Sequence, residues 1–271
     1  MKKAYTTVLT IAGSDGSGGA GIQADIKTFA ALECYGLSVI TALTAQNTLG
    51  VSAIYPLAET IVSAQFRAIT ADISIDAVKI GMLGNAAIIK AVAALLMELK
   101  GNPPIILDPV LGSSGGTTFY SPEAILLMMK ELFPLATLIT PNLPETALLT
   151  GRKKKLETPQ AIEDASLHLH KTGAASILVK GGHGESNECR DCLFYDNRFF
   201  WFSSKKIITN NSHGTGCTLS SAIAAFMAKG ETTENAVKKA KNYIDETLQA
   251  GTDYRLGNGN GPLQHFYRLW K

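Results

Sequence analysis

The sequence lacks both a large excess of charge and an apolar run long enough to cross a bilayer. Its 271 residues carry 25 Lys and Arg against 23 Asp and Glu, a formal net charge of +2. Such a balance gives no electrostatic attraction to nucleic acid or to a membrane surface. A spanning helix needs about 20 apolar residues, whereas segment 86–99 is interrupted by Lys90 and Glu98. We therefore expect a soluble protein that binds a small molecule, with no nucleic-acid or membrane partner.

Cysteine is scarce, with four residues at Cys34, Cys189, Cys192 and Cys217. The N-terminal apolar stretch Val8–Ala12 is too short for a secretory signal, so we expect reduced thiols in a cytoplasm. Cys189 and Cys192 form an isolated C-x-x-C. Zinc would require further cysteines or histidines at ligand spacing, and only His183 is near. We interpret the pair as incidental.

What the sequence does contain is a regular alternation of apolar β-branched runs and helical patterns, within a chain that is 46% hydrophobic. Short strands that are apolar on both faces are typical of a parallel sheet covered by helices. The β-α-β-α order predicts an α/β fold, with a mostly parallel central sheet and helices on both faces, in a single domain over 1–271. The expected strands are 8–12, 37–44, 51–55, 77–80, 105–107, 138–140, 176–179, 192–195 and 199–202, the last two as an antiparallel hairpin. The expected helices are 21–33, 59–72, 86–100, 122–132, 145–149, 159–172, 217–229 and 234–250.

Polar or glycine-rich segments follow most of these strands. In open α/β sheets, ligands bind at the carboxyl ends of the strands. Seven such segments at one edge are difficult to explain by packing alone, so we predict a binding site there. They are 13–21, 46–47, 81–82, 108–116, 141–145, 180–182 and 211–217.

The first of these segments contains G-x-G-x-x-G at Gly16, Gly18 and Gly21. A dinucleotide site would also need an acidic residue after the second strand to bind a ribose. That strand ends at Gln46-Asn47 instead, and no Lys-Ser/Thr follows the glycines as in a P-loop. A plain flexible turn stays open. We favour a loop whose backbone closely approaches a small ring, with Asp25 near enough to accept a hydrogen bond from the ligand.

The last segment, residues 211–218, precedes an apolar helix. Gly214 and Gly216 allow the N–H groups of residues 214–217 to converge at the helix N-terminus. Such a nest binds phosphate and stabilises the charge that grows during phosphoryl transfer. Cys217, in the first turn, is interpreted as a base whose pKa the helix end lowers. A structural thiol and a Cys–His nucleophile formed with His213 are the alternatives.

Taken together, the segments resemble the hydroxymethylpyrimidine/phosphomethylpyrimidine kinase family, which has a ribokinase-like fold and is close to one group of pyridoxal kinases. The matching motifs occur in the family's order along the chain, and the tail GNGPLQHFYRLW is similar too. The motifs are AGSDGSGGAGIQADIK (12–27), TALTAQNT (41–48), KIGML (79–83), DPV (108–110), TPNLPE (140–145), VKGGH (179–183) and HGTGC (213–217).

The resemblance implies an activity and a substrate pocket. The expected reaction is phosphorylation by ATP of 4-amino-5-hydroxymethyl-2-methylpyrimidine, and of its monophosphate, in thiamine biosynthesis. The implied pyrimidine pocket consists of Gly13, Asp25, Gln46, Met82 and Val110. Gln46 and Asp25 can match ring nitrogens and an exocyclic amine, while Met82 and Val110 can cover an apolar ring face.

The resemblance also implies the phosphate and metal contacts. Asp108 and Glu145 match the acidic residues that hold Mg²⁺ through its waters, the sparse protein ligation that this ion prefers. The residues expected at the transferring phosphates of ATP are Asn142, Lys180, Thr215 and Gly216. Relatives of this kind are commonly homodimers, so a dimer is expected.

One segment departs from the family pattern. Some members carry a cysteine or Lys-Ser just after DPV, whereas this chain has Leu111 followed by the Gly/Ser-rich residues 112–116. We expect a lid that excludes water when it closes. A pyridoxal kinase of the same fold, a non-catalytic vitamin- or nucleotide-binding protein and, less favoured, a nicotinamide oxidoreductase are the alternative functions. Gln46 favours the aminopyrimidine over pyridoxal.

Overall fold

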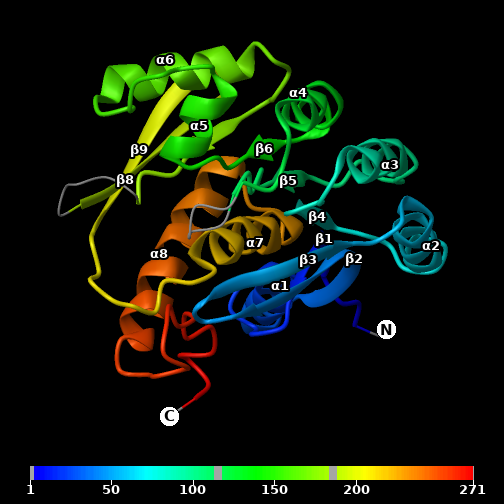
Figure 1. The fold of residues 1–271 in the computed structure, drawn as a ribbon, viewed down its shortest axis with the longest axis horizontal. Helices are drawn as coiled ribbons and strands as arrows, with labels where there is room; N and C mark the ends of the chain where they lie inside the picture. The colour runs from blue at the N-terminus through cyan, green and yellow to red at the C-terminus, as the bar shows by residue number, and fades with distance from the viewer. Residues whose placement is uncertain (1–2, 113–117, 183–187, 271) are drawn as a thin grey trace.

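The computed structural model describes residues 3–112, 118–182 and 188–270. Within these ranges, nine strands form one sheet in the order β3-β2-β1-β4-β5-β6-β7-β8-β9 (Figure 1). The strands are β1 (Thr7–Asp15), β2 (Tyr35–Asn47), β3 (Gly50–Pro56), β4 (Ala77–Ile80), β5 (Ile105–Leu107), β6 (Leu138–Ile139), β7 (Ile177–Val179), β8 (Glu188–Tyr195) and β9 (Arg198–Lys205). The helices are α1 (Gly21–Ala31), α2 (Glu59–Thr70), α3 (Ala86–Met97), α4 (Pro122–Glu131), α5 (Leu143–Leu149), α6 (Pro159–His170), α7 (Thr215–Ala228) and α8 (Thr233–Gly251).

The middle of the sheet is parallel and its two ends are antiparallel. Strands β2, β1, β4, β5, β6 and β7 pair in parallel. β3 pairs antiparallel with β2, and the β8–β9 hairpin closes the other end. Asp196 and Asn197 both have positive φ, 51° and 56°, the left-handed conformation that a tight hairpin turn requires. The mostly parallel sheet and the hairpin are therefore as the sequence predicts.

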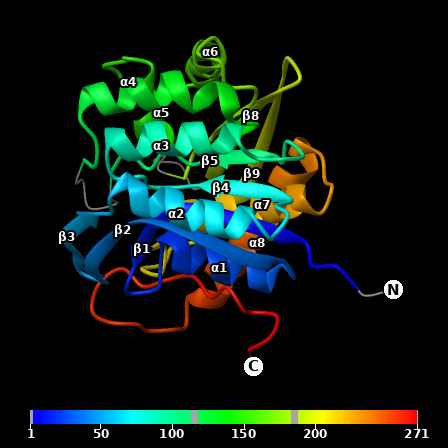
Figure 2. The same ribbon diagram turned by 90° about the vertical axis from the view of Figure 1, so that its right-hand side faces the viewer.

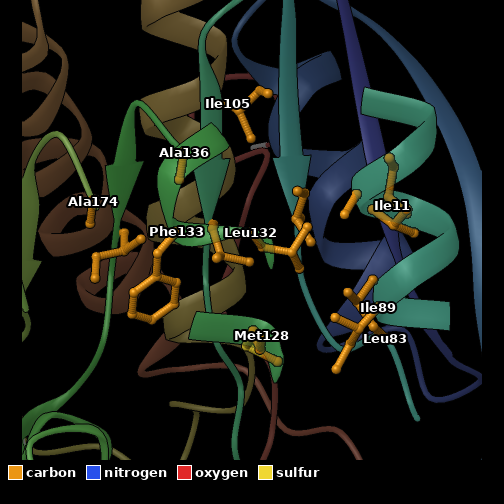
Figure 3. Packing of buried hydrophobic residues seen from close by; sticks show 14 of the residues in the cluster. Ile11, Leu83, Ile89, Ile105, Met128, Leu132, Phe133, Ala136 and Ala174 are labelled. Atoms are coloured by element: carbon orange, nitrogen blue, oxygen red, sulfur yellow. The ribbon is translucent and has the colours of Figure 1, made fainter. Parts of the chain in front are cut away.

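Two apolar cores lie on opposite faces of this sheet. One core receives Phe66 from α2, Ile89 from α3 and Met128 from α4, and Figure 3 shows part of it, with Phe133 close to Leu132. The other receives residues of α1, α7 and α8. Figure 2 shows the two helical layers on either side of the sheet. All nine expected strands and all eight expected helices are confirmed, with ends that differ by a few residues.

The order of the strands indicates a ligand-binding site at the carboxyl edge of the sheet. After β1 the chain continues outward to β2 and β3, and it then returns to the other side of β1 as β4. Ligands bind where the strand order reverses in this way. No helix within the described ranges is long and apolar enough to cross a bilayer.

Candidate active site

A layer of polar side chains lies on the sheet face that α7 covers. Along a strand, alternate residues face opposite sides. In β4, Val78 and Ile80 belong to the core with α2 and α3, so Lys79 between them faces the side of α7. The same alternation places polar side chains, from neighbouring strands and from the residues directly after them, on the side of α7. They are Thr10, Lys79, Asp108, Thr140 and Lys180.

The N-terminus of α7 presents backbone N–H groups above this layer. Gly214 precedes the helix with a φ of 85°, and a β-carbon there would collide with the carbonyl oxygen of Gly19. Thr215 donates its N–H to Ser212 at 3.3 Å. The N–H groups of Gly214, Gly216 and Cys217 have no acceptor in the part of the chain that the structure describes. Unpaired N–H groups at a helix start form a site for an anion.

Lys180 and Asp108 meet beside these N–H groups. Their ion pair measures 2.9 Å between Lys180 Nζ and Asp108 Oδ1. A β-carbon on Gly216 would lie 3.2 Å from Lys180 Nζ and 3.4 Å from Asp108 Oδ2, so glycine allows the lysine to approach the helix start closely. Burial lowers the pKa of Lys180, but Asp108 and Glu145 outweigh this effect and raise it above its usual value. Lys180 is therefore a fixed cation next to the N–H nest.

Glu145 is held by backbone donors at the start of α5. Asn142 and Glu145 form a capping box, in which Asn142 Oδ1 accepts from Glu145 N–H and Glu145 Oε2 accepts from Asn142 N–H, both at 2.8 Å. The second oxygen, Oε1, accepts from Leu111 N–H at 3.0 Å. Burial raises the pKa of Glu145; Lys180 counteracts this effect and Asp108 adds to it. The carboxylate thus faces the Lys180–Asp108 pair in a fixed orientation.

Two carboxylates of this kind fit a magnesium ion held through its waters. Asp108 Oδ1 is engaged by Lys180, and both oxygens of Glu145 accept one N–H each. Carboxylates already hydrogen-bonded in this way suit outer contacts better than a full protein cage. In the described ranges, no group of three or more His, Cys, Asp or Glu is placed to hold a metal ion.

Cys217 is partly exposed at the first turn of α7. The lowered pKa expected from its place at a helix start is wrong. Burial raises the pKa of its thiol; Lys79 lowers it, Asp25 and Asp108 raise it, and the Gly21 N–H lowers it. The ligand-free thiol is therefore mainly protonated at neutral pH.

The Cys–His alternative finds no support in the contacts of His213. Its Nε2 lies 2.8 Å from Asp15 Oδ2 and 3.1 Å from Gln46 Nε2. No hydrogen bond joins it to Cys217 among the described residues. The ring instead links the glycine-rich loop, strand β2 and the N–H nest.

This histidine also defines how the Gln46 amide must be oriented. A carboxylate only accepts, so His213 Nε2 carries the hydrogen that Asp15 receives, and it cannot accept another from Gln46. Turning the Gln46 amide by half a turn would place its oxygen toward His213 and its NH₂ toward Thr44. The amide atom on the Thr44 side lies 3.2 Å from Thr44 Oγ1. The Thr44 hydroxyl already donates to Ser14 at 2.9 Å and is free to accept. We therefore assign the amide oxygen to the side of His213.

Three other residues of the expected pyrimidine pocket lie near the carboxyl ends of neighbouring strands: Gly13 in β1, Met82 after β4 and Val110 after β5. A β-carbon on Gly13 would lie 2.5 Å from Met82 Cε, so the Met82 side chain fits here only because residue 13 is a glycine. Val110 is half-buried and has a φ of 45°. A β-branched residue in the left-handed region is strained, and such strain occurs preferentially at functional sites.

Asp25 does not fit the expected contact with a ligand. Its side chain is fully buried, and both oxygens lie 2.9 Å from Lys79 Nζ. Oδ2 also accepts from Thr10 at 2.6 Å, and Oδ1 from Ser221 at 2.7 Å. Because its acceptor sites are occupied inside the protein, Asp25 belongs to the interior of the site and is not part of the pocket wall.

The glycine-rich loop turns its own N–H groups inward. Asp15 accepts from Ser17 N–H and Ala20 N–H at 2.9 and 2.8 Å, and Gly18 N–H donates to Asp15 O at 2.9 Å. Those donors are unavailable to a pyrophosphate, which opposes the dinucleotide alternative. Burial would raise the pKa of Asp15, but hydrogen bonds, the strongest from His213, lower it to about 2.

Some residues of the site were missed by sequence reasoning. Lys79 is the principal one, and its signal was a charge in the middle of a four-residue strand that is otherwise apolar. Asp15 and His213 were quoted in motifs but not paired. The lid segment, with residues 113–117, and His183 lie outside the described residues. Cys189 and Cys192 are both free thiols on β8, and their odd spacing directs them to opposite faces of the sheet, so they form no redox pair.

The fold and this site define a small-molecule kinase of the ribokinase-like class. The family model for phosphomethylpyrimidine kinase matches residues 15–264. A hydroxymethylpyrimidine/phosphomethylpyrimidine kinase of Rhizobium meliloti is 45% identical over 263 residues, which cover 97% of this chain and 98% of that protein. The chain belongs to the phosphomethylpyrimidine kinase family.

Solved structures agree with this membership. Phosphomethylpyrimidine kinase from Clostridium difficile has 41% identity and a TM-score of 0.78, covering 89% of this chain and 99% of its own. The pyridoxal kinase from Staphylococcus aureus in complex with AMP-PCP and pyridoxal has 31% identity and a TM-score of 0.88, covering 98% and 95%. The fold is thus shared by kinases that act on two different vitamin precursors or vitamers.

Proposed function

We propose that this chain transfers the γ-phosphoryl group of ATP to the hydroxymethyl group of 4-amino-5-hydroxymethyl-2-methylpyrimidine, and also phosphorylates the resulting monophosphate. The observation that carries this proposal is the convergence of unpaired N–H groups at Gly216 and Cys217 with Lys180 and Asp108. Donors and a cation aimed at one point stabilise the negative charge of phosphoryl transfer.

In the proposed reaction the substrate oxygen forms a bond to the γ-phosphorus while the bond from that phosphorus to the ADP oxygen breaks. The N–H groups of Gly216 and Cys217 and the ammonium of Lys180 bind the transferring group. Asn142, in the capping box of α5, and Thr215 contact the ATP phosphates. Asp108 and Glu145 would hold Mg²⁺ through its waters, and the bound ion would supply positive charge beside the phosphates.

The proton of the substrate hydroxyl goes to the sulfur of Cys217, which must be a thiolate when it accepts. Because the surroundings raise the pKa of this thiol, only a small fraction is ionised in the ligand-free protein at neutral pH. A loose transition state needs the proton removed late, after most of the bond to ADP has broken. A weakly ionised base is compatible with such timing.

The pocket favours the aminopyrimidine over pyridoxal. With its oxygen toward His213, the Gln46 amide has an NH₂ group at hand for a ring nitrogen and an oxygen that can accept from an exocyclic amine. The side chain of Met82, which packs against Gly13, would cover an apolar face of the ring. Phosphorylation of pyridoxal remains the second candidate, because the S. aureus pyridoxal kinase has the same fold.

One assay tests the proposal directly. ADP release is measured with the hydroxymethylpyrimidine, its monophosphate and pyridoxal supplied in parallel. We expect turnover of both pyrimidines with a higher kcat/KM than pyridoxal, and preference for pyridoxal would overturn the substrate assignment. In Cys217→Ala, kcat is expected to fall by about 10²–10⁴-fold, with pyrimidine binding retained. Cys189→Ala, a second half-buried thiol on β8, is the matched control and keeps full turnover.

We further propose that the chain acts as a single domain, as a homodimer and in the cytoplasm. The single sheet that contains all nine described strands supports the first point. Sedimentation equilibrium tests the second, and a monomer at working concentrations would contradict it.

A further inference from the structure

The buried ion pair of Lys79 and Asp25 has no part in the proposed reaction as described above. Both side chains are 0% exposed, and Lys79 Nζ lies 2.9 Å from each carboxylate oxygen. Neither group can touch a ligand from this position. Burying two charges is costly, and apolar residues of similar size often serve stability equally well. The place of this pair beside the helix that carries Cys217 therefore needs another explanation.

The pair is tied to the helix that carries Cys217. Asp25 Oδ1 accepts a hydrogen bond from Ser221 at 2.7 Å, and Ser221 follows Cys217 by four residues, one turn along the same helix face. Asp25 Oδ2 accepts from Thr10 on β1 at 2.6 Å. The two charges are thus fixed to α1, β1, β4 and α7, and their positions relative to the sulfur do not depend on a ligand.

Further groups face Cys217 from neighbouring elements. Asp108 follows β5 and Lys180 follows β7, and both interact electrostatically with the thiol. The backbone N–H of Gly21, at the start of α1, also lowers the pKa of the thiol. Burial raises the thiol pKa most strongly, Lys79 lowers it, and Asp25 and Asp108 raise it. Lys79 is therefore the strongest of these influences in favour of the thiolate.

We propose that Lys79 and Asp25 are positioning residues that set the ionisation of Cys217, with Lys79 stabilising the thiolate and Asp25 holding Lys79 in place while limiting that stabilisation. This inference rests on the proposed role of Cys217 as the proton acceptor. The sealed pair acts by charge alone: the proton leaves the substrate oxygen for the sulfur, and the thiol later returns it to solvent. The balance of these two opposite charges keeps the sulfur basic enough to accept that proton.

The test is the pH dependence of the alkylation of Cys217 by iodoacetamide in the ligand-free protein, followed by mass spectrometry of the Cys217 peptide. Only the thiolate reacts, so the midpoint reports the pKa of the thiol. We expect Lys79→Met to move this midpoint upward by about one pH unit and Asp25→Asn to move it downward. Loss of structure would move both in the same direction. Shifts of the same sign, or no shift in either variant, would overturn the proposal.

Two controls keep the result interpretable. Lys241 and Asp191 form a second buried ion pair, at 2.7 Å, on α8 and β8; Lys241→Met and Asp191→Asn are expected to leave the midpoint of Cys217 unchanged. If Lys79→Met does not fold, the double variant Lys79→Met/Asp25→Asn replaces it, because an amide at 25 still accepts from Thr10 and Ser221. Its midpoint must then lie above that of Asp25→Asn, and the opposite order refutes the inference.

The alkylation experiment needs no turnover, so its outcome is separable from the proposed function. If the proposed function is also right, the acidic limb of the kcat profile shifts in the same direction as the alkylation midpoint in each variant. Opposite alkylation shifts without any phosphorylation of pyrimidine would leave this inference standing and refute the proposed function.

Discussion

Two ion pairs beneath helix α7 share a geometry and differ in access. Lys79–Asp25 and Lys180–Asp108 both measure 2.9 Å, and in both a lysine in or directly after a sheet strand binds a nearby carboxylate. The side chains of the first pair are 0% exposed, whereas Lys180 is 13% and Asp108 3% exposed. A sealed pair can act only through its charge and its position. An accessible pair can exchange its partner for a phosphate group or for a hydrated metal ion.

Because the two pairs differ in access, we expect the Lys79–Asp25 pair to affect mainly stability and the Lys180–Asp108 pair to affect mainly turnover. Removal of one partner from a sealed pair leaves a buried charge without compensation, which is strongly destabilising. Because the Lys180 side chain is 13% exposed, water can replace its ammonium beside Asp108, and the Ser220 hydroxyl lies 3.4 Å from that carboxylate, so the cost in stability is smaller. Its cost in catalysis is larger, because the lysine faces the N–H nest. We therefore expect Lys180→Met to lower mainly turnover and Lys79→Met to lower mainly stability, although the two substitutions are chemically identical.

The largest expected effect is that of Lys180→Met on turnover. We expect kcat to fall by about 10³-fold, the usual scale for one preorganised charge on a transition state. Steady-state kinetics with the hydroxymethylpyrimidine measures this change. Lys130→Met, at an exposed lysine of α4, is the matched control and keeps normal kcat. A loss of less than about tenfold for Lys180→Met would remove this lysine from the transition-state contacts.

The second effect is that of Lys79→Met on the free energy of unfolding. A buried carboxylate left without its partner costs about 3–5 kcal/mol. Urea unfolding at pH 7 measures this loss, which should exceed that of Lys180→Met. In the double variant with Asp25→Asn we expect most of the stability to return. Equal losses for the two lysine variants would show that access does not distinguish the pairs.

The contrast between the two pairs also shows what the sequence could and could not predict. The strand pattern placed Lys180 and Asp108 at the carboxyl edge of the sheet, because each follows a strand, and the family resemblance implied their roles. Strand position along the chain is a one-dimensional property, and apolar periodicity is sufficient to find it. The same argument placed Glu145, Asn142 and Gly216 at this edge, and the structure brings all of them together.

Asp25 shows where that reasoning ends. Its helical position beside the glycine-rich loop was correct, but its orientation depends on a partner 54 residues away, Lys79, and on Ser221 at 196 residues. No periodicity encodes which of two neighbouring spaces a side chain enters. The pKa of Cys217 was wrong for a similar reason: the helix start was visible in sequence, whereas the burial that outweighs it depends on the packing of α7 against the sheet.

A third acid–base pair has intermediate access and sharpens the comparison. His213 is 17% and Asp15 3% exposed, and the pKa of Asp15 is lowered from 3.8 to about 2. A lowered carboxyl pKa adds stability above the unfolded value, and that stability is lost as the pH falls through the folded value. We expect a contribution of about 2 kcal/mol at pH 5 that disappears between about pH 4 and 2. Urea unfolding across this range measures it, and Asp15→Asn should show a flatter profile there.

The smallest expected effect is that of a substitution at Gln46, whose amide lies 3.1 Å from His213 of the third pair. Its amide contacts only His213 and Thr44 in the described part of the chain, and we propose that its remaining donor and acceptor positions bind the pyrimidine. Gln46→Ala should therefore raise the KM for the pyrimidine about tenfold, which corresponds to about 1.4 kcal/mol. The KM for ATP should stay unchanged, since the phosphate contacts lie at α7 and Lys180. Gln160→Ala, at an exposed glutamine of α6, is the control. Equal increases in both KM values would mean that Gln46 acts through His213 on the N–H nest instead of binding the pyrimidine. The solvent access of a side chain would then not predict whether it touches the substrate.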